Sequence, residues 1–386
     1  MKLTRSAWME VNLDKLENNM SQIKNIVDDN IKIISVVKSN AYSFGVTKIV
    51  ETLRKTGVNY FAVATNSEAL KIRKNFNDVD ILVLGHTPDF LMEDAIDNNI
   101  VMAVYDLESA LKLNEMANSK NKVARIHLAI DSGMNRIGFK LKEKSYSDVE
   151  KISKLENVKI EGAFSHFAAA DTDIEYTKNQ FANYKTFVEE VEKRGVDVGL
   201  KHINNSQGII NYKESSLDAV RPGIVQYGST EGVESKYEGF SVDYIGEIKA
   251  RITNLKVIEK GEKVSYGLTY EADKTTEVAT IPLGYSDGLL RQLSNKIDVL
   301  VNGNRCPQIG RICMDQMMID VTGMNCKIGD EVVVLGKQGN EEITILEIAE
   351  KAGEIATSYS CHFSMRLPRV YIRDGKVESI YDINLE

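Results

Sequence analysis

The chain lacks the features that mark membrane, secreted and nucleic-acid-binding proteins. No stretch approaches the roughly 18 apolar residues of a membrane-spanning helix, and the first residues run into Glu10 and Asp14 without the apolar core of a signal peptide. A net charge of −8 over 386 residues is too acidic to favour a nucleic-acid partner. We therefore expect a cytoplasmic protein whose partners are a small molecule and itself, with no nucleic acid and no membrane among them.

Metal and disulfide chemistry are not indicated either. The 4 cysteines all lie late in the chain without CxxC spacing, and the 5 histidines form no pair typical of a zinc site. The chain also contains no internal repeat, low-complexity tract or long linker. The lack of a linker predicts that its parts pack closely against each other.

Apolar, β-branched runs alternate with segments of helical period in the first part of the chain. The runs are too uniformly apolar to have a solvated face, which is typical of parallel strands buried on both sides. Eight such strands over about 230 residues predict a TIM-type α/β barrel, although an open doubly wound sheet fits the same pattern. The predicted strands are Ile33–Val37, Tyr60–Ala64, Ile81–Leu84, Ile100–Val104, Ala124–Ile130, Ile160–Phe164, Leu200–Ile203 and Gly223–Tyr227.

Helix signals lie between these runs. Thr65 and Glu68 form a capping box, and Asp106 can cap a second helix. A third helix is indicated by an apolar stripe of helical period, formed by Phe181, Tyr184, Val188 and Val191.

The sequence pattern changes after about residue 241. Short runs broken by glycines predict a mainly β domain, interrupted by one helix that Thr344 begins with Glu347 as its capping-box partner. We therefore expect a barrel over residues 1–241 and a mainly β domain over residues 242–386.

Lys38 is the most informative single residue. It follows the first predicted strand, at the end of the barrel where enzymes of this fold carry their chemistry. Burial in a pocket lowers the pKa of an amine and makes it a nucleophile or base. Taken alone, Lys38 can equally be interpreted as a lysine that simply marks the end of a strand.

Further polar side chains lie at other predicted strand ends. Ser206 and the backbone amides of Gly223 and Ile224 would lie beside strands seven and eight, where such barrels commonly bind phosphate. A lysine, a phosphate cradle and an arginine at one mouth suggest pyridoxal phosphate. Each residue also has a simpler role, since His166 can be a core histidine, Ser206 a helix cap and Arg221 half of an ion pair. The polar residues in question are Tyr42, His166, Asn205, Ser206 and Arg221.

Short motifs that include these residues follow one another along almost the whole chain. They are Val36–Tyr42, Ile130–Gly138, His166–Ala168, Asn205–Ser206, Arg221–Gly223, Val264–Gly267, Gly284–Gly288 and Cys313–Gln316. In this order and at this spacing they resemble the alanine racemase family. The resemblance implies a barrel followed by a β domain, and pyridoxal 5'-phosphate bound to Lys38. It also implies a head-to-tail homodimer in which the β domain of one subunit completes the active site of the other.

The resemblance assigns two acid–base groups. Racemisation removes a proton from one face of the substrate and returns one to the other face, so it requires two such groups. Lys38 is implied on one face, and Tyr266 of the partner subunit on the other. His166 is implied as the neighbour of that tyrosine, although it can also position a strand end without touching a proton.

The resemblance also assigns the groups that hold cofactor and substrate. Arg221 faces the cofactor's ring nitrogen, and a guanidinium, which only donates, pairs only with an unprotonated nitrogen. Such a pairing weakens the cofactor as an electron sink and disfavours side reactions. Arg136 and the backbone amide of Met314 are implied to hold the substrate carboxylate, and Tyr42 to contact the phosphate. Tyr285 is implied at the entrance, with packing at a domain interface as its alternative role.

Three departures from the family pattern bear on substrate choice. Ala129 replaces a lysine that is commonly carbamylated, so something else, such as a bound anion, must position Arg136. Met365 replaces a tyrosine that reaches the phosphate and borders the substrate, and a thioether lacks the O–H donor. Ser43 and Phe44 stand where glycine and histidine are usual, which suggests that the turn tolerates a Cβ at this position, although the change can also shift Tyr42.

We therefore predict a pyridoxal-phosphate-dependent isomerase that interconverts L- and D-alanine by a two-base mechanism, the reaction of D-alanine biosynthesis. Racemisation of serine or a larger amino acid is the alternative, because a missing phenol opens the pocket. A non-catalytic pyridoxal-phosphate-binding protein usually lacks a β domain. A decarboxylase of this fold type favours a more glycine-rich phosphate loop and an acidic partner for the ring nitrogen.

Overall fold

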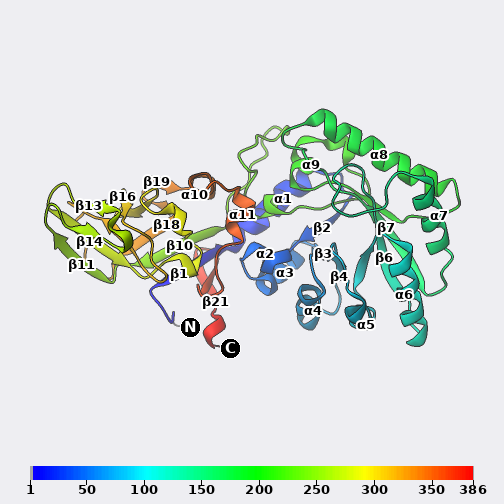
Figure 1. The fold of residues 1–386 in the computed structure, drawn as a ribbon, viewed down its shortest axis with the longest axis horizontal. Helices are drawn as coiled ribbons and strands as arrows, with labels where there is room; N and C mark the ends of the chain where they lie inside the picture. Colours follow the sequence, from blue (N-terminus) through cyan, green and yellow to red (C-terminus); the bar gives the residue numbers. More distant parts are fainter. Residues whose placement is uncertain (1–2, 386) are drawn as a thin grey trace.

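The protein consists of an α/β barrel and a mainly β part that lie at opposite ends of an elongated molecule (Figure 1). The structure, a computed structural model, describes residues 3–385, so residues 1, 2 and 386 of the two predicted domains lie outside it. Within residues 3–385, no helix has the length and apolar character needed to cross a membrane.

Eight parallel strands close into a barrel in the order β2-β3-β4-β5-β6-β7-β8-β9. The barrel closes where β9 pairs with β2, through Lys32 opposite Ala219 and Ile33 opposite Val220. This confirms the predicted TIM-type barrel over the open sheet. The strands are β2 (Lys32–Val36), β3 (Tyr60–Val63), β4 (Asp80–Val83), β5 (Val101–Val104), β6 (Ala124–Ala129), β7 (Val158–Phe164), β8 (Leu200–His202) and β9 (Ala219–Val220).

The eighth strand is not where the sequence predicted it. The predicted segment Gly223–Tyr227 forms the 3-10 helix η2 (Ile224–Tyr227), and the last barrel strand is the two-residue β9 just before it. Two residues are too few to show a strand pattern, whereas the longer apolar run nearby does show one. As a result, Arg221 follows the last strand rather than leading into it, and it lies at the same end of the barrel as Lys38.

The helices around the barrel begin where the capping signals predicted. Thr65 and Glu68 form both bonds of a capping box at α4, and Asp106 accepts a hydrogen bond from the backbone of Ser109 at α6. The apolar stripe of α8 is buried as expected. The helices of this part are α1 (Leu13–Ile26), α2 (Lys38–Tyr42), α3 (Val46–Lys55), α4 (Asn66–Asn75), α5 (Asp89–Asp97), α6 (Leu107–Ser119), α7 (Glu143–Ile152), α8 (Ile174–Glu192), α9 (Ser206–Asn211) and η1 (Lys213–Ser215).

The second part is built on an 11-stranded sheet, which confirms that it is mainly β. The strand order is β11-β14-β17-β16-β15-β18-β10-β1-β20-β21, with β19 on β18, and β12 and β13 form a separate hairpin. The strands are β10 (Gly246–Arg251), β11 (Asn254–Ile258), β12 (Lys263–Val264), β13 (Tyr270–Glu271), β14 (Thr276–Ile281), β15 (Asp298–Val301), β16 (Asn304–Ile309), β17 (Met317–Asp320), β18 (Glu331–Gln338), β19 (Glu341–Ile343), β20 (Arg369–Arg373) and β21 (Lys376–Tyr381).

Short helices connect these strands. Thr344 caps α10 by accepting a hydrogen bond from the backbone of Glu347, at the predicted start. The helices are η3 (Tyr266–Leu268), η4 (Tyr285–Asp287), η5 (Arg291–Leu293), α10 (Ile345–Ala352), α11 (Ala356–Ser360) and η6 (Ile383–Leu385).

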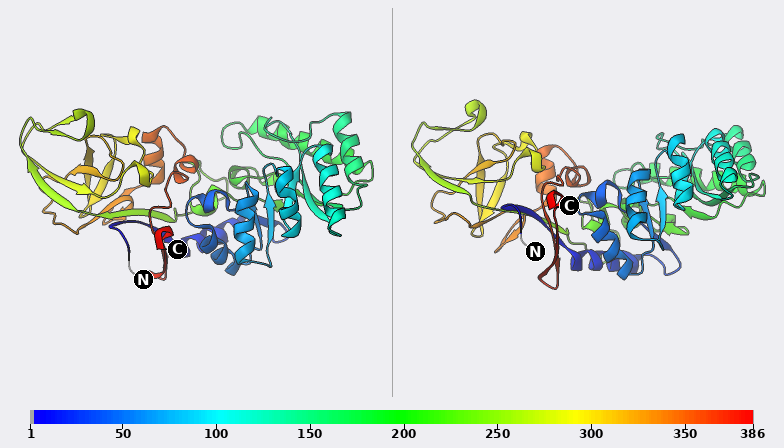
Figure 2. Two further views of the ribbon diagram at one scale, coloured as in Figure 1. Left: turned by 60° about the horizontal axis from the view of Figure 1, so that its bottom comes forward. Right: turned by 90° about the horizontal axis from the view of Figure 1, so that it is seen from below.

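The first strand of the chain, β1 (Ala7–Asn12), belongs to the sheet of the β part. It runs antiparallel to β10 and parallel to β20, and the chain then enters α1 beside the barrel. The sequence placed this segment with the barrel, because a single strand does not indicate its pairing partner. Figures 1 and 2 show both chain ends close together where the two parts meet.

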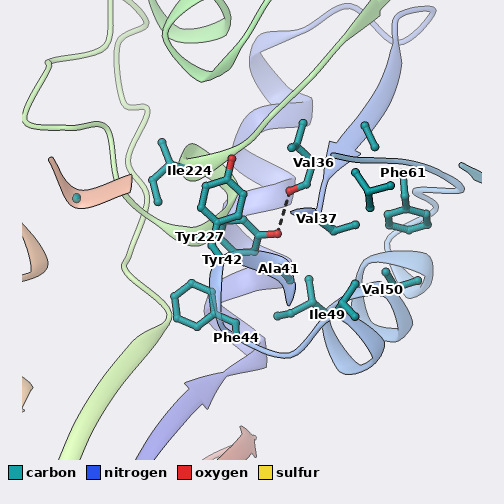
Figure 3. Packing of buried hydrophobic residues seen from close by; sticks show 14 of the residues in the cluster. Val36, Val37, Ala41, Tyr42, Phe44, Ile49, Val50, Phe61, Ile224 and Tyr227 are labelled. Atoms are coloured by element: carbon teal, nitrogen blue, oxygen red, sulfur yellow. Dashed lines mark hydrogen bonds between the residues drawn. The ribbon is translucent and has the colours of Figure 1, made fainter. Parts of the chain in front are cut away.

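Aromatic packing supports the turn that follows β2 (Figure 3). The ring centroid of Tyr42 lies 4.8 Å from that of Tyr227, and the fully buried Phe44 lies 5.3 Å from Tyr227 and 5.7 Å from Tyr244. The Tyr227 hydroxyl donates to the carbonyl of Val36 at 3.0 Å. Phe44 therefore fills an apolar site, and its replacement of the usual histidine leaves no buried polar group unsatisfied at this position.

Candidate active site

A cavity of about 570 Å³ opens at the carboxyl ends of the barrel strands. It lies at the end where barrel enzymes carry their chemistry. Nine of the twelve predicted site residues line it: Lys38, Tyr42, Arg136, His166, Asn205, Ser206, Arg221, Gly223 and Ile224.

Lys38 is half-buried at the start of α2, directly after the first barrel strand. Burial, and then the positive charge of Arg136, lower the pKa of its amine. The residues that follow form a left-handed turn, because 39–43 all have φ between 53° and 72°. L-residues enter this region at a cost of roughly 1–2 kcal/mol each, so the surrounding structure must hold the turn in place.

Arg369, which is fully buried on β20, holds this turn. Its guanidinium donates from Nε and Nη2 to the carbonyl of Ser43, at 3.0 and 2.8 Å. It also donates to the carbonyls of Phe363, Ser364 and Leu367. Burial lowers the pKa of Arg369 to about 10. One arginine from the β part thus joins the turn after Lys38 to the segment that carries Met365.

Ser206, Gly223 and Tyr42 form a cradle on one wall of the cavity. The hydroxyl oxygen of Ser206 accepts hydrogen bonds from the backbone amides of Gly223 (3.0 Å) and Val225 (3.3 Å). A Cβ on Gly223 would lie 2.8 Å from the Tyr42 hydroxyl and 3.4 Å from the Ser206 hydroxyl. Only glycine therefore keeps open the space between these two hydroxyls.

Arg221 is buried beside this cradle, and its terminal nitrogens are fully engaged. Nη1 donates to Nδ1 of His202 at 2.6 Å, and Nη2 to the carbonyls of Ser165 (2.6 Å) and Ile203 (3.0 Å) and to Nδ1 of His166 (3.2 Å). Arg221 has no carboxylate partner among the described residues, so the alternative role of Arg221 as half of an ion pair is not found there. Burial lowers its pKa to about 9.

The contact with Arg221 determines which nitrogen of His166 carries a proton. Because a guanidinium only donates, Nδ1 of His166 must accept, and a neutral ring then carries its proton on Nε2. Nδ2 of Asn205 lies 3.5 Å from this Nε2 and donates to the carbonyl of Phe167 at 3.3 Å. Burial, followed by the charges of Arg221, Arg136 and Lys38, lowers the pKa of His166 well below its usual range. The ring is therefore neutral at neutral pH. Asn205 caps α9 by accepting a hydrogen bond from the backbone of Gly208.

The position of the missing lysine is filled by apolar packing. Ala129 is buried with Ala103 and Phe164, and Tyr105 packs against this cluster. Arg136 is exposed and forms no hydrogen bond or ion pair with any described residue. Nothing in this part of the chain therefore takes over the orientation that the lysine commonly supplies.

Met365 contacts the turn after Lys38 rather than lining the cavity. Its sulfur lies 2.9 Å from Nδ2 of Asn40, whose Oδ1 accepts a hydrogen bond from the backbone of Val46 at 3.1 Å. A weak sulfur acceptor thus stands where many family members carry a phenol.

The other three predicted site residues lie on the surface of the β part, outside the cavity. Tyr266 is 68% exposed, Met314 51% and Tyr285 38%. Tyr266 precedes β13, which lies at the end of the β part far from the barrel (Figure 1). The structure therefore brings the chain's own Tyr266 to a different place from its own Lys38.

The backbone before Tyr266 is strained. Ser265 has φ 67° and ψ −174°, a region that is occupied essentially by glycine alone. Its hydroxyl donates to the carbonyl of Arg311 at 2.6 Å and lies 3.4 Å from the sulfur of Cys313. The strained residue thus directly precedes the exposed Tyr266.

Known proteins similar to this chain match it over nearly its full length. The family models "Alanine racemase, N-terminal domain" and "Alanine racemase, C-terminal domain" match residues 11–231 and 245–371. The alanine racemase of Clostridium tetani is 42% identical over 98% of both chains. The solved alanine racemase of Clostridium difficile 630 is 38% identical, with a TM-score of 0.95 over 99% of both chains. The histidine racemase of Leuconostoc mesenteroides is 28% identical, with a TM-score of 0.89 over 96% of this chain and 99% of that one.

Proposed function

The chain belongs to the alanine racemase family, and from this premise we propose that it interconverts L- and D-alanine with pyridoxal 5'-phosphate bound in the barrel cavity. The observation that carries the proposal is the convergence of three groups in that cavity. They are the amine of Lys38 with its lowered pKa, the glycine-lined cradle beside Ser206, and Arg221 without a carboxylate partner.

The cavity residues suit the cofactor. The space that Gly223 leaves between the hydroxyls of Tyr42 and Ser206 can take a phosphate, and the Ile224 amide lies beside it. Nε of Arg221 makes no hydrogen bond to any described residue, so it can donate to a ring nitrogen. When bound, the cofactor supplies an electron sink for the carbanion that proton removal leaves on the substrate.

Two side chains would move the proton. The lowered pKa of Lys38 raises the fraction of neutral amine that can accept a proton from the α-carbon on one face. The hydroxyl of Tyr266 would serve the other face. His166, with its proton on Nε2, would donate a hydrogen bond toward that hydroxyl and stabilise its ionised form.

This arrangement requires a second copy of the chain. Tyr266, Met314 and Tyr285 are exposed on the β part and absent from the cavity that holds Lys38. In a head-to-tail homodimer, Tyr266 of the partner subunit would reach the cavity, and its exposed surface would become buried. The backbone amide of Met314 from the same partner would hold the substrate carboxylate together with Arg136, and Tyr285 would line the entrance.

The proposed division of labour follows the two parts of the chain. Residues 1–241 would supply the cofactor site, apart from the β1 segment, and residues 242–386 the second acid–base group. We also propose that the protein acts in the cytoplasm on a free amino acid.

Racemisation of serine or a larger amino acid is the second candidate function. It is favoured by the apolar site at Ala129, which leaves Arg136 without a partner among the described residues. A member of the same fold that is named a histidine racemase aligns with nearly the whole chain.

Chiral chromatography of product mixtures tests both candidates. The purified protein would be incubated with pyridoxal phosphate and, separately, with L-alanine, L-serine, L-lysine and L-ornithine, with Lys38→Ala as the control. We expect D-alanine to form well ahead of the other D-isomers. Faster conversion of another amino acid would keep the mechanism and reassign the substrate, and no D-isomer from any of them would overturn the racemase assignment.

A further inference from the structure

We propose that a chain of hydrogen bonds through the barrel interior orients Arg221 without neutralising it, and that His127 and Tyr60 are positioning residues for the site at the mouth. The chain of bonds runs from Arg221 to His202, His127 and Tyr60. The proposal rests on the proposed function only for the group that Arg221 faces.

The contacts are short and continuous. Nη1 of Arg221 lies 2.6 Å from Nδ1 of His202, Nε2 of His202 lies 2.9 Å from Nδ1 of His127, and Nε2 of His127 lies 3.1 Å from the Tyr60 hydroxyl. His202 and His127 are 0% and 1% exposed. The chain of bonds links strands on different sides of the barrel, because His202 lies on β8, His127 on β6 and Tyr60 on β3.

The chain of bonds ends near the opposite face of the barrel. Tyr60 is the first residue of β3, at its amino-terminal end, and it lines a separate cavity of about 470 Å³ together with Asp80, Lys24 and Asp28. Arg125 lies at the same end and pairs with Asp80 (2.8 Å). The bonds therefore run from the mouth of the barrel to its far end.

The barrel makes room for this chain at one specific position. A Cβ on Gly162 would lie 2.5 Å from Cε1 and 2.7 Å from both ring nitrogens of His127, so β7 can pass this ring only with glycine. The ring of Phe164 stacks on His202 at 5.5 Å and 13°. Barrel interiors are usually filled by branched apolar side chains. A row of hydrogen-bonded polar side chains that also requires a glycine on the next strand is therefore a specific feature of this barrel, since buried polar groups are costly without partners.

Only one direction of donation is possible along this chain. Arg221 cannot accept, so Nδ1 of His202 accepts and a neutral ring places its proton on Nε2. That proton is donated to Nδ1 of His127, whose own proton must then lie on Nε2 and point to the Tyr60 oxygen. Burial lowers the pKa of both rings, to about 3 for His127, so both are neutral at neutral pH.

A neutral imidazole suits this position better than a carboxylate would. A carboxylate would hold the guanidinium but also neutralise it, whereas the imidazole accepts one hydrogen bond and leaves the positive charge facing the cavity. Arg221 fixes the tautomer of His202 because a guanidinium only donates, and His127 and Tyr60 hold the His202 ring in place by accepting in turn. The chain of bonds thus holds Arg221 where it lines the cavity.

Nitrogen-15 NMR of the histidine rings tests this directly. The full-length protein, labelled at histidine, would be measured with and without pyridoxal phosphate. We expect His202 and His127 to show an unprotonated Nδ1 and a protonated Nε2 in both samples. A protonated Nδ1 on either ring, or a cationic ring at neutral pH, would overturn the proposal. If the protein shows the expected tautomers but racemises no amino acid, this proposal is supported and the proposed function is rejected.

Variants separate positioning from simple support of the fold. Tyr60→Phe removes the oxygen that accepts from Nε2 of His127, so it should change the nitrogen-15 shift of that Nε2 and lower kcat with little change in KM. His127→Leu should lower kcat about 10- to 100-fold, because a shifted catalytic group has an effect of this size. His127→Asn, whose amide oxygen can still accept from His202, should retain more activity than His127→Leu. His362→Asn, at an exposed position, is the control. Unchanged kcat in both Tyr60→Phe and His127→Leu would contradict the proposal.

Discussion

The barrel mouth and the loop that carries Tyr266 differ in how completely they are formed within one chain. At the mouth, Arg221 and Ser206 are buried and each has defined hydrogen-bond partners. On the loop, Tyr266 and Leu268 are largely exposed and contribute to no cavity with Lys38. One region is thus formed within a single chain, and under the proposed function the other would act only when it meets a second copy of the chain.

The two regions share one property, which is backbone strain beside a proposed acid–base residue. The turn 39–43 follows Lys38 with left-handed backbone throughout, and Ser265 precedes Tyr266 in a glycine-like conformation. The first is held across the molecule by Arg369, and the second by a local hydrogen bond to Arg311. Strain of this kind persists only where the surrounding structure over-determines it, and it gathers at functional sites.

The largest expected effect is at the mouth. Lys38→Ala removes the amine that is proposed to serve one face of the substrate and to attach the cofactor, so racemisation should fall by about 10⁴-fold or more. Product formation measured by chiral chromatography checks this. Lys32→Ala, at an exposed position at the start of β2, the strand before Lys38, should keep the parent rate.

The second prediction concerns the loop. Tyr266→Phe should lower racemisation by about 10²- to 10⁴-fold while cofactor absorbance is retained, because it removes only the hydroxyl that is proposed to transfer the proton. Absorbance and rate measured on one preparation check this. Tyr270→Phe, on the neighbouring strand β13, serves as control. A Tyr266→Phe variant as active as the parent would contradict the two-base assignment.

The third prediction concerns the link between the regions. Arg369→Met leaves four buried carbonyls without their donor, so we expect it to lower the free energy of unfolding by about 3 kcal/mol or more. Denaturant unfolding measures this change. Arg251→Met, at an exposed arginine, should change the same quantity by well under 1 kcal/mol. Equal losses in the two variants would show that Arg369 does not hold the turn.

The fourth prediction is a pH dependence of stability that arises from His127, a buried histidine of the barrel. The pKa of His127 is about 3 in the folded protein and near 6.5 in the unfolded chain, so between these values the unfolded chain binds more protons. Stability should therefore decline as pH falls from about 6.5, by up to about 1.4 kcal/mol per pH unit for this histidine. Urea unfolding at pH 7.5, 6 and 5 measures the slope, which should be shallower in His127→Asn. Parallel slopes would mean that His127 is not buried in its neutral form.

The general plan of the molecule could be predicted from the sequence, because apolar runs and caps are local signals. Thr65, Asp106 and Thr344 begin helices as expected. The two-residue β9 and the pairing of β1 with the β part could not be predicted, since the first is too short for a pattern and the second depends on distant partners.

The row of hydrogen-bonded residues inside the barrel, Arg221, His202, His127 and Tyr60, could not be predicted for a different reason. Its histidines lie within apolar runs that indicated strands, and a single sequence does not show which strands bring them together. Two polar residues in apolar runs could have indicated buried hydrogen bonds, since polar groups in buried strands require partners. They are His127 inside Ala124–Ile130 and Arg369 at the start of an apolar strand.

The central claim, that two chains build each site, is tested by mixing two inactive variants. Lys38→Ala and Tyr266→Phe chains with different affinity tags would be co-expressed, and the mixed dimer isolated. In a head-to-tail dimer one site of the mixed pair has both Lys38 and Tyr266 intact, so the account predicts about half the parent activity per dimer. A mixed dimer as inactive as either variant alone would contradict it and place both residues in a site within one chain.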